Sequence, residues 1–130
     1  MSDLPHKISY QVEPWEVVKA DSAWLWPLHW EEVARDKNKI KLDLDIAAYD
    51  YLASIKQLVT ITVRCDGKIV GYHWSIVRNH LHYKGSLTAY TDVYYLYPEY
   101  RKGSVGINLF KFFEQEMRKL GVQKMYSATK

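Results

Sequence analysis

The feature that most constrains the fold is a pair of long, β-branched runs joined by two turn residues. The first run is LVTITVRC (58–65), the second is KIVGYHWSIVRN (68–79), and Asp66 and Gly67 lie between them. Asp-Gly at this spacing predicts a type I′ turn, because both central residues of that turn need a positive φ. A third run, SLTAYTDVYYLY (86–97), predicts a strand antiparallel to the second, so a three-stranded antiparallel unit forms the centre of the chain.

Two patterns upstream of this unit predict a strand followed by helices. KISYQV (7–12) alternates polar and apolar residues, as a half-buried strand does. Residues 15–35 have apolar side chains at helical spacing, and Pro27 is expected to divide them into two short helices. Asp45 is a suitable N-cap for a further helix over IAAYDYLASI (46–55).

Downstream, the pattern changes to a helix and then a last strand. Apolar side chains of residues 107–120 fall on one helix face with charged ones opposite, and Gly121 supplies a C-terminal stop. VQKMYSAT (122–129) predicts the final strand. The predicted order is β-α-α-β-β-β-α-β, an α+β (α/β) fold with a mostly antiparallel central sheet and one right-handed β-α-β crossover. Residues 1–130 are expected to form a single domain, since 130 residues are too few for two.

Composition and charge argue against several classes of protein. The formal net charge of +3 comes from 18 basic and 15 acidic residues scattered along the chain, so no nucleic-acid-binding arm is expected. Apolar runs are only a few residues long and the N-terminus MSDLPHKISY has no signal-peptide core, so we expect neither a membrane span nor secretion. Cys65 is the single cysteine, which favours a reducing compartment, and the protein is therefore predicted to be cytoplasmic.

The stretch YPEYRKGSVGIN (97–108) joins the third long strand to the amphipathic helix through a short loop. Backbone N–H groups at a helix N-terminus, together with the positive end of the helix dipole, favour a bound anion. Gly103 and Gly106 allow the backbone to approach a ligand closely, and Arg101 and Lys102 add positive charge. The loop is therefore predicted to bind a pyrophosphate group.

This loop resembles the acyl-CoA pyrophosphate loop of the GNAT family of N-acetyltransferases, whose signature is Arg/Gln-x-x-Gly-x-Gly/Ala. In RKGSVG, Arg101 and Gly106 take the outer positions, while Ser104 stands at the central position that is usually glycine. The segments PLHWEEVA, NHLHY and TDVYYLYPEYRKG are similar, more narrowly, to acetyltransferase-like proteins encoded by bacteriophages. The predicted element order agrees with the first two-thirds of the GNAT fold.

The resemblance implies that acetyl-CoA is the acyl donor, and it assigns roles to the strand end and the loop. The backbone of Leu96 and Tyr97 would pair with the pantetheine arm as an added strand does, and the Leu96 amide would stabilise the oxyanion of the thioester carbonyl. The pyrophosphate would lie against six loop residues: Arg101, Lys102, Gly103, Ser104, Val105 and Gly106.

Asp92 is the candidate catalytic base that would accept a proton from the amine. Strand alternation predicts that Asp92, Tyr94 and Leu96 share one face of the sheet. Burial inside an aromatic strand would raise the pKa of the Asp92 carboxyl towards a useful range. A structural role, in which Asp92 is hydrogen-bonded to a neighbouring group, stays open as the alternative.

Four further side chains are candidates for contact with the acceptor. His29 and Glu32 lie on the second short helix, which borders the acceptor groove in the related fold. His80 and His82 lie in the loop between the two long strands, but no third ligand occurs at a suitable spacing, so no metal site is predicted. Three tryptophans are interpreted as packing residues rather than as a substrate cage: Trp24, Trp26 and Trp30.

The sequence stops at YSATK (126–130), before the point at which the related fold adds a helix with a frequent general-acid tyrosine and two more strands. Two functions are therefore kept. The first is an acetyl-CoA-dependent N-acetyltransferase that acts on an amine, of a small molecule or a protein lysine, by direct attack in a ternary complex. The second is a catalytically silent GNAT-like module that binds a host or virion protein. The edge of the last strand would allow a homodimer.

Overall fold

The computed structural model describes residues 7–33, 44–79 and 85–127. These residues form one five-stranded sheet in which the strands follow one another in sequence order. Neighbouring strands are antiparallel, except for the last pair, which is parallel. The strands are β1 (Ile8–Val12), β2 (Leu58–Cys65), β3 (Lys68–Asn79), β4 (Leu87–Leu96) and β5 (Val122–Tyr126).

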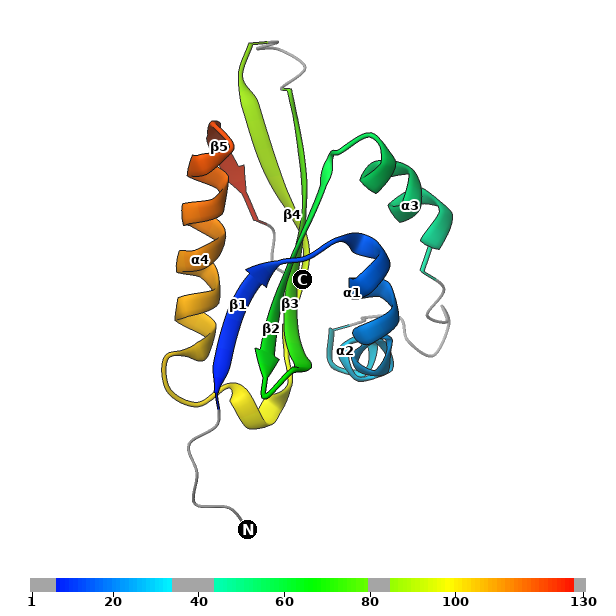
Figure 1. Ribbon diagram of the computed structural model, residues 1–130, viewed down its shortest axis with the longest axis vertical. Helices are drawn as coiled ribbons and strands as arrows, with labels where there is room; N and C mark the ends of the chain where they lie inside the picture. Colours follow the sequence, from blue (N-terminus) through cyan, green and yellow to red (C-terminus); the bar gives the residue numbers. More distant parts are fainter. Residues whose placement is uncertain (1–6, 34–43, 80–84, 128–130) are drawn as a thin grey trace.

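Helices cover both faces of this sheet (Figure 1). The helix between β4 and β5 lies on one face, and the three helices between β1 and β2 lie on the other. The α-helices are α1 (Trp15–Asp21), α2 (Trp26–Val33), α3 (Ile46–Ser54) and α4 (Val105–Lys119), and two 3-10 turns, η1 (Ala23–Leu25) and η2 (Pro98–Tyr100), complete the set. The predicted fold class and the order of the five strands are confirmed, although three α-helices lie between β1 and β2 where the predicted order counted two.

Each face of the sheet has its own apolar core. On one face, α4 buries Leu109, Phe113 and Met117 against the sheet, as its helical spacing predicts. On the other face, α1 and η1 bury residues such as Val18 and Leu25 against the aromatic side chains of β3. Most residues of β3 are buried between the two layers of helices, whereas β4 has exposed residues at Asp92 and Tyr94.

The local predictions that rest on turn and cap chemistry are confirmed. Asp66 and Gly67 both have positive φ, 52° and 90°, as the type I′ turn between β2 and β3 requires. The Asp45 side chain accepts a hydrogen bond of 3.0 Å from the Ala48 N–H and so caps α3. The helical region 15–35 is divided as expected, although the break is at η1 and Pro27 lies in the first turn of α2, where proline is tolerated.

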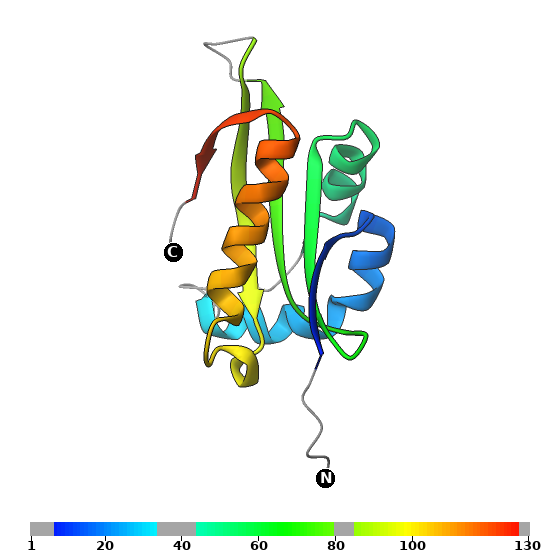
Figure 2. The same ribbon diagram turned by 60° about the vertical axis from the view of Figure 1, so that its left-hand side comes forward.

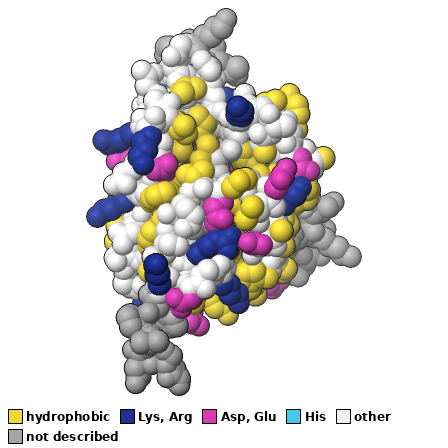
Figure 3. Space-filling view, viewed as in Figure 1, with side chains coloured by type: hydrophobic (Ala, Val, Ile, Leu, Met, Phe, Trp, Pro, Cys, Tyr) yellow, Lys and Arg dark blue, Asp and Glu magenta, His cyan; other side chains and the backbone are white. Residues whose placement is uncertain are grey.

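Arg64 fastens α1 to the first two strands. Its guanidinium donates to the Glu13 carboxylate at 2.8 Å and to the Asp21 carboxylate at 3.0 Å. Figure 3 shows this face of the molecule, on which basic and acidic side chains are interspersed. Within the described residues, no helix has the length and apolar content needed to cross a membrane.

Two irregularities occur in the C-terminal half of β4. The ladder between β3 and β4 pairs Trp74 with Val93 but Ser75 with Thr91, which leaves Asp92 as the extra residue of a β-bulge. On its other edge, β4 pairs with β5 only over residues 87–90 (Figure 2). Beyond Tyr90 the two strands separate, so no described strand pairs with residues 91–96 on that edge.

The close approach of β3 and β4 next to this open edge depends on Gly71. A Cβ atom added there would lie 2.7 Å from Leu96 Cδ1 and 2.9 Å from the Tyr95 carbonyl oxygen. Because the second contact is with backbone, Gly71→Ala must push β4 aside, and we expect a loss of about 1–3 kcal/mol in the free energy of unfolding, measured with urea. Gly85→Ala is the matched control, since its Cβ would meet open space. A loss for Gly71→Ala no larger than that of the control would contradict this role.

Candidate functional site

The backbone of Leu96 faces the open edge of β4. The Tyr97 N–H donates to the Val70 carbonyl at 2.8 Å, and in an antiparallel ladder alternate residues point to opposite sides. The Leu96 N–H and C=O therefore point away from β3, towards the edge that β5 leaves uncovered. A bond of 2.7 Å from Arg101 Nε to the Leu96 carbonyl agrees with this direction.

Tyr97 is less available for such pairing than the sequence predicted. Its N–H is bonded to Val70, and its carbonyl accepts a 2.9 Å bond from the Tyr100 N–H at the end of η2. The turn that follows β4 therefore uses both backbone groups of Tyr97. Leu96 is the residue at the strand end whose N–H points towards the open edge.

The loop after β4 turns sharply into α4. Gly103 has a φ of 74°, in the left-handed region that favours glycine, and Ser104 occupies the N-cap position without a capping bond from its side chain. The first-turn N–H groups of α4, at Val105 and Gly106, have no intrahelical partners, as in any helix. The sequence predicted that an anion binds at these amides and at the positive end of the helix dipole, and this binding stays a prediction.

A cavity of about 320 Å³ joins the strand edge to this helix start. It is lined by Glu32, Tyr94, Tyr95, Leu96, Arg101, Gly106, Leu109 and Phe110. The backbone of Leu96 and the N-terminal turn of α4 thus border one space, although they are separated by a loop. An extended ligand with an anionic group could therefore contact both.

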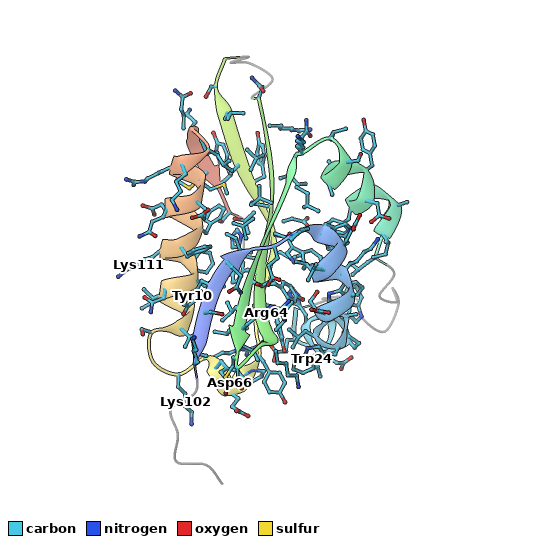
Figure 4. All side chains as sticks on the ribbon, in the orientation of Figure 1. Tyr10, Trp24, Arg64, Asp66, Lys102 and Lys111 are labelled. Carbon is cyan, nitrogen blue, oxygen red and sulfur yellow. The ribbon has the colours of Figure 1, made fainter. Side chains whose placement is uncertain are left out.

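The charged side chains of the loop are placed differently from each other. Arg101 turns back over the end of β4, where its guanidinium donates to the Glu32 carboxylate at 2.6 Å and lies over the Tyr95 ring. Lys102 is exposed and points away from the body of the protein (Figure 4). Predicted anion contacts of the loop therefore depend on its backbone first, and on Arg101 once it leaves Glu32.

The prediction that Asp92 shares a face with Tyr94 and Leu96 is wrong. The bulge at Asp92 interrupts the alternation, so that Asp92 and Val93 both lie on the face of α1 to α3. Tyr94 lies on the opposite face, where its ring packs edge-on against Phe110 of α4. Asp92 is also exposed, whereas the sequence interpretation placed it inside a buried aromatic strand.

Asp92 borders a second cavity, of about 270 Å³, on the face of α1 to α3. The lining consists of Trp26, His29, Trp30, Leu44, Tyr49, Tyr72, Trp74, Asp92 and Val93. The His29 ring lies on one side, where Nδ1 is 2.8 Å from the Tyr72 hydroxyl and the ring stacks on Tyr95. His29 and Asp92, both predicted from the sequence, are therefore brought to one cavity.

Tyr49 is a member of this cavity that the sequence did not single out. Its hydroxyl donates to Asp92 Oδ2 at 2.6 Å, and burial, followed by the Asp92 carboxylate, raises the pKa of Tyr49 well above its usual value. Tyr49 therefore stays a hydrogen-bond donor at neutral pH and holds Asp92 in place. The two residues are 43 positions apart, so no local pattern could have paired them.

The other predicted contact residues are divided between locations. Glu32 lies beside Arg101 at the first cavity, not at the second. His80 and His82 lie outside the described residues. Trp26 and Trp30 line the second cavity while Trp24 does not, and no three His, Cys, Asp or Glu side chains in the described part of the chain are grouped as a metal site would require.

His73 is a fully buried histidine on the α4 face, 4.1 Å from the Phe113 ring centre. Nε2 is 3.2 Å from the Thr91 hydroxyl, which in turn lies 2.9 Å from the Ser127 hydroxyl just after β5. The three side chains link β3, β4 and the end of β5 at the point where the last two strands separate. Burial lowers the pKa of His73 to about 4, so the imidazole is neutral at pH 7.

This burial predicts a pH dependence of stability. Between the ordinary histidine pKa of 6.5 and the folded value of about 4, the unfolded state binds the proton and the folded state does not. Stability is therefore full above pH 6.5 and decreases as the pH falls towards 4, by about 3 kcal/mol from this residue. Urea unfolding of wild type and His73→Leu over this range should show the smaller pH slope in the variant. Equal slopes would contradict the assignment.

A larger cavity of about 910 Å³ lies elsewhere, between α1, α3 and the first two strands. Residues such as Lys19, Asp50 and Lys56 line it, and none of the predicted site residues does. Its position away from the open edge of β4 separates it from the two cavities described above.

Comparison with known proteins identifies the family and the fold of the chain. The sequence profile of the acetyltransferase (GNAT) family matches residues 17–130, so the chain belongs to that family. The α+β arrangement described above is accordingly the GNAT fold. A search of curated protein sequences finds no match.

Solved structures of acetyltransferases share the fold at low sequence identity. A ribosomal-protein-alanine N-acetyltransferase from Brucella melitensis biovar Abortus has 12% identity and a TM-score of 0.71, with 95% of this chain and 81% of that chain covered. A predicted acetyltransferase from Clostridium acetobutylicum with acetyl-CoA has 13% identity and a TM-score of 0.71, covering 95% and 82%. An aminoglycoside acetyltransferase from a soil metagenomic sample, in complex with sisomicin, has 15% identity and a TM-score of 0.71, covering 96% and 78%.

Proposed function

We propose that the protein is an acetyl-CoA-dependent N-acetyltransferase that modifies an amine. One observation carries this proposal: the Leu96 N–H points from an unpaired strand edge into the region where the first turn of α4 also presents its amides. The N–H of Leu96 is the kind of donor that stabilises a thioester carbonyl during acyl transfer, and amides at a helix N-terminus are donors that bind a pyrophosphate. Membership of the acetyltransferase (GNAT) family supports the same proposal.

In this proposal the two cavities receive the two substrates. Acetyl-CoA lies in the cavity on the α4 face, with its pantetheine arm along residues 91–96 of β4 and its pyrophosphate at Gly103 to Gly106. The amine enters the cavity on the opposite face, beside Asp92 and His29. The two substrates meet at the edge of β4 over residues 91–96. No described strand pairs with this edge, so the edge is open to both faces of the sheet.

The reaction then follows from the groups at hand. Asp92, directly or through a water, accepts one proton from the ammonium, and the freed lone pair of nitrogen attacks the thioester carbonyl carbon. The Leu96 N–H stabilises the resulting oxyanion, the new C–N bond persists, and the C–S bond breaks to release the CoA thiolate. The second proton lost by nitrogen neutralises the thiolate, and the products are an amide and CoA.

Calorimetric titration of the purified protein with acetyl-CoA, and separately with CoA, tests the donor half of the proposal. We expect micromolar affinity for both, because the pyrophosphate and pantetheine contacts are common to them. A folded protein that binds neither would overturn the proposed function.

One observation favours a second candidate, a GNAT-fold module that engages a protein partner without catalysis. Arg101 already donates a hydrogen bond to the Leu96 carbonyl and is paired with Glu32. The pantetheine arm of acetyl-CoA would have to displace the bond between Arg101 and Leu96. Absence of CoA binding in the same titration would favour this second candidate over the first. A bacteriophage origin, a cytoplasmic location and a homodimer formed through the last strand remain predictions from the sequence.

A further inference from the structure

The cavity beside Asp92 has an unusual lining for its size. Of its nine described lining residues, five are tryptophans or tyrosines that come from three different elements, α2, α3 and β3: Trp26, Trp30, Tyr49, Tyr72 and Trp74. Ring faces attract an ammonium group, and they also pack well against uncharged carbon. A volume of about 270 Å³ admits a small molecule or a single arm of a larger one.

Charge in this cavity is confined to one place. Asp92 is the only carboxylate among the described lining residues, and Lys and Arg do not occur among them. The Tyr49 hydroxyl donates a hydrogen bond to Asp92 Oδ2, so the Asp92 carboxylate points from β4 towards α3. One cation can therefore be paired, at the end of the cavity nearest the open edge of β4.

A second polar group of the lining residues, the indole N–H of Trp74, is buried without a hydrogen-bond partner among the described residues. Trp74 is 1% exposed. A buried donor without a partner is costly, and a ligand or water oxygen would satisfy it. The aromatic walls, the single carboxylate and the unpaired indole together describe a ligand site and not merely a gap in packing.

We propose that the acceptor is a primary monoamine whose ammonium group pairs with Asp92 and whose uncharged alkyl or arylalkyl arm lies between the aromatic rings. This inference rests on the proposed function and names its substrate class. A second ammonium within the arm would leave water without a carboxylate to pair with, and that desolvation is unfavourable. Polycationic amines, including aminoglycosides, are therefore poor ligands of this cavity.

A matched pair of ligands tests whether the cavity prefers an amine with a single ammonium group. n-Pentylamine and 1,4-diaminobutane have the same number of heavy atoms, and they differ in whether the far end is a methyl or an ammonium group. In calorimetry at pH 7, performed both without and with added CoA, we expect pentylamine to bind at least about tenfold more tightly than diaminobutane or sisomicin. 1-Pentanol, which lacks the cation, should also bind at least about tenfold more weakly.

A pair of tryptophan variants tests the location. Trp30→Leu removes an aromatic wall and keeps an apolar side chain, so pentylamine affinity should fall about fivefold or more. Trp24→Leu is the control, because Trp24 belongs to the same helical region but lies outside the cavity, beside Lys68 near the β2–β3 turn (Figure 4). The control should bind pentylamine as the wild type does.

The outcomes separate this inference from the proposed function. Binding of diaminobutane or sisomicin as tight as that of pentylamine would overturn the monoamine class, and an equal effect of the two tryptophan variants would overturn the location. If CoA binds but none of these amines does, the inference fails and the donor site stands. If pentylamine binds by these rules while CoA does not, the cavity stands and the acetyltransferase function fails.

Discussion

Gly106→Glu is expected to abolish binding of CoA, lowering its affinity by at least about a hundredfold. Gly106 lies in the first turn of α4 and lines the cavity next to Leu96. A carboxylate at this position places negative charge where the pyrophosphate would lie and competes with it for the amides of the helix N-terminus. Calorimetric titration with CoA measures the loss directly.

The loss can be separated from a folding defect. An added Cβ at Gly106 meets only Leu96 Cδ2, at 3.9 Å, which is an ordinary contact. Glutamate in the first turn of a helix also favours the helix dipole, so the thermal midpoint of Gly106→Glu should not fall. Gly106→Ala is the matched control and should retain CoA affinity to within about threefold. Tight CoA binding by the Glu variant would rule out this loop as the pyrophosphate site.

Asp92→Asn should lower turnover at pH 7 by at least about tenfold, with CoA affinity little changed. Asparagine keeps an oxygen that can accept the bond from the Tyr49 hydroxyl, so the bulge and the cavity should retain their shape. What the variant loses is the group that accepts a proton from the amine. Release of the CoA thiol with a monoamine such as pentylamine, followed across pH, measures the effect.

Asp50→Asn supplies the comparison for this variant. Asp50 lies one residue from Tyr49 on α3, but its carboxylate accepts from Trp15 and Lys19 and lines a different cavity. Its replacement should leave turnover unchanged. If Asp92→Asn kept the pH–rate profile of the wild type, the base would have to be sought elsewhere, and His29 is the next group in the same cavity.

The elements of the fold could be predicted because their signals are local. The Asp66-Gly67 turn, the Asp45 cap and the amphipathic spacing of α4 each depend on residues within a few positions of one another. These are the features for which the sequence interpretation and the structure agree.

The features that could not be predicted depend on contacts between distant residues. The bulge at Asp92 results from the pairing of two strands, and it reverses the face on which that carboxylate lies. Tyr49 reaches Asp92 across 43 residues, and Arg101 reaches Glu32 across 69. The periodicity of a sequence contains no information on such pairs. The sequence could therefore name Asp92 as a candidate base, but it could not predict the residues around it.

Helix α2 links the two cavities through side chains one turn apart. Glu32 holds Arg101 at the donor side, and His29 lies against Tyr72 and Tyr95 at the acceptor side. In the proposed complex, the phosphates of acetyl-CoA would draw Arg101 away from Glu32, and α2 would lose this bond close to the cavity wall that His29 forms. Thermodynamic reciprocity requires that any factor by which acetyl-CoA changes the affinity for the amine is also the factor by which the amine changes the affinity for acetyl-CoA, so α2 would couple the two binding sites.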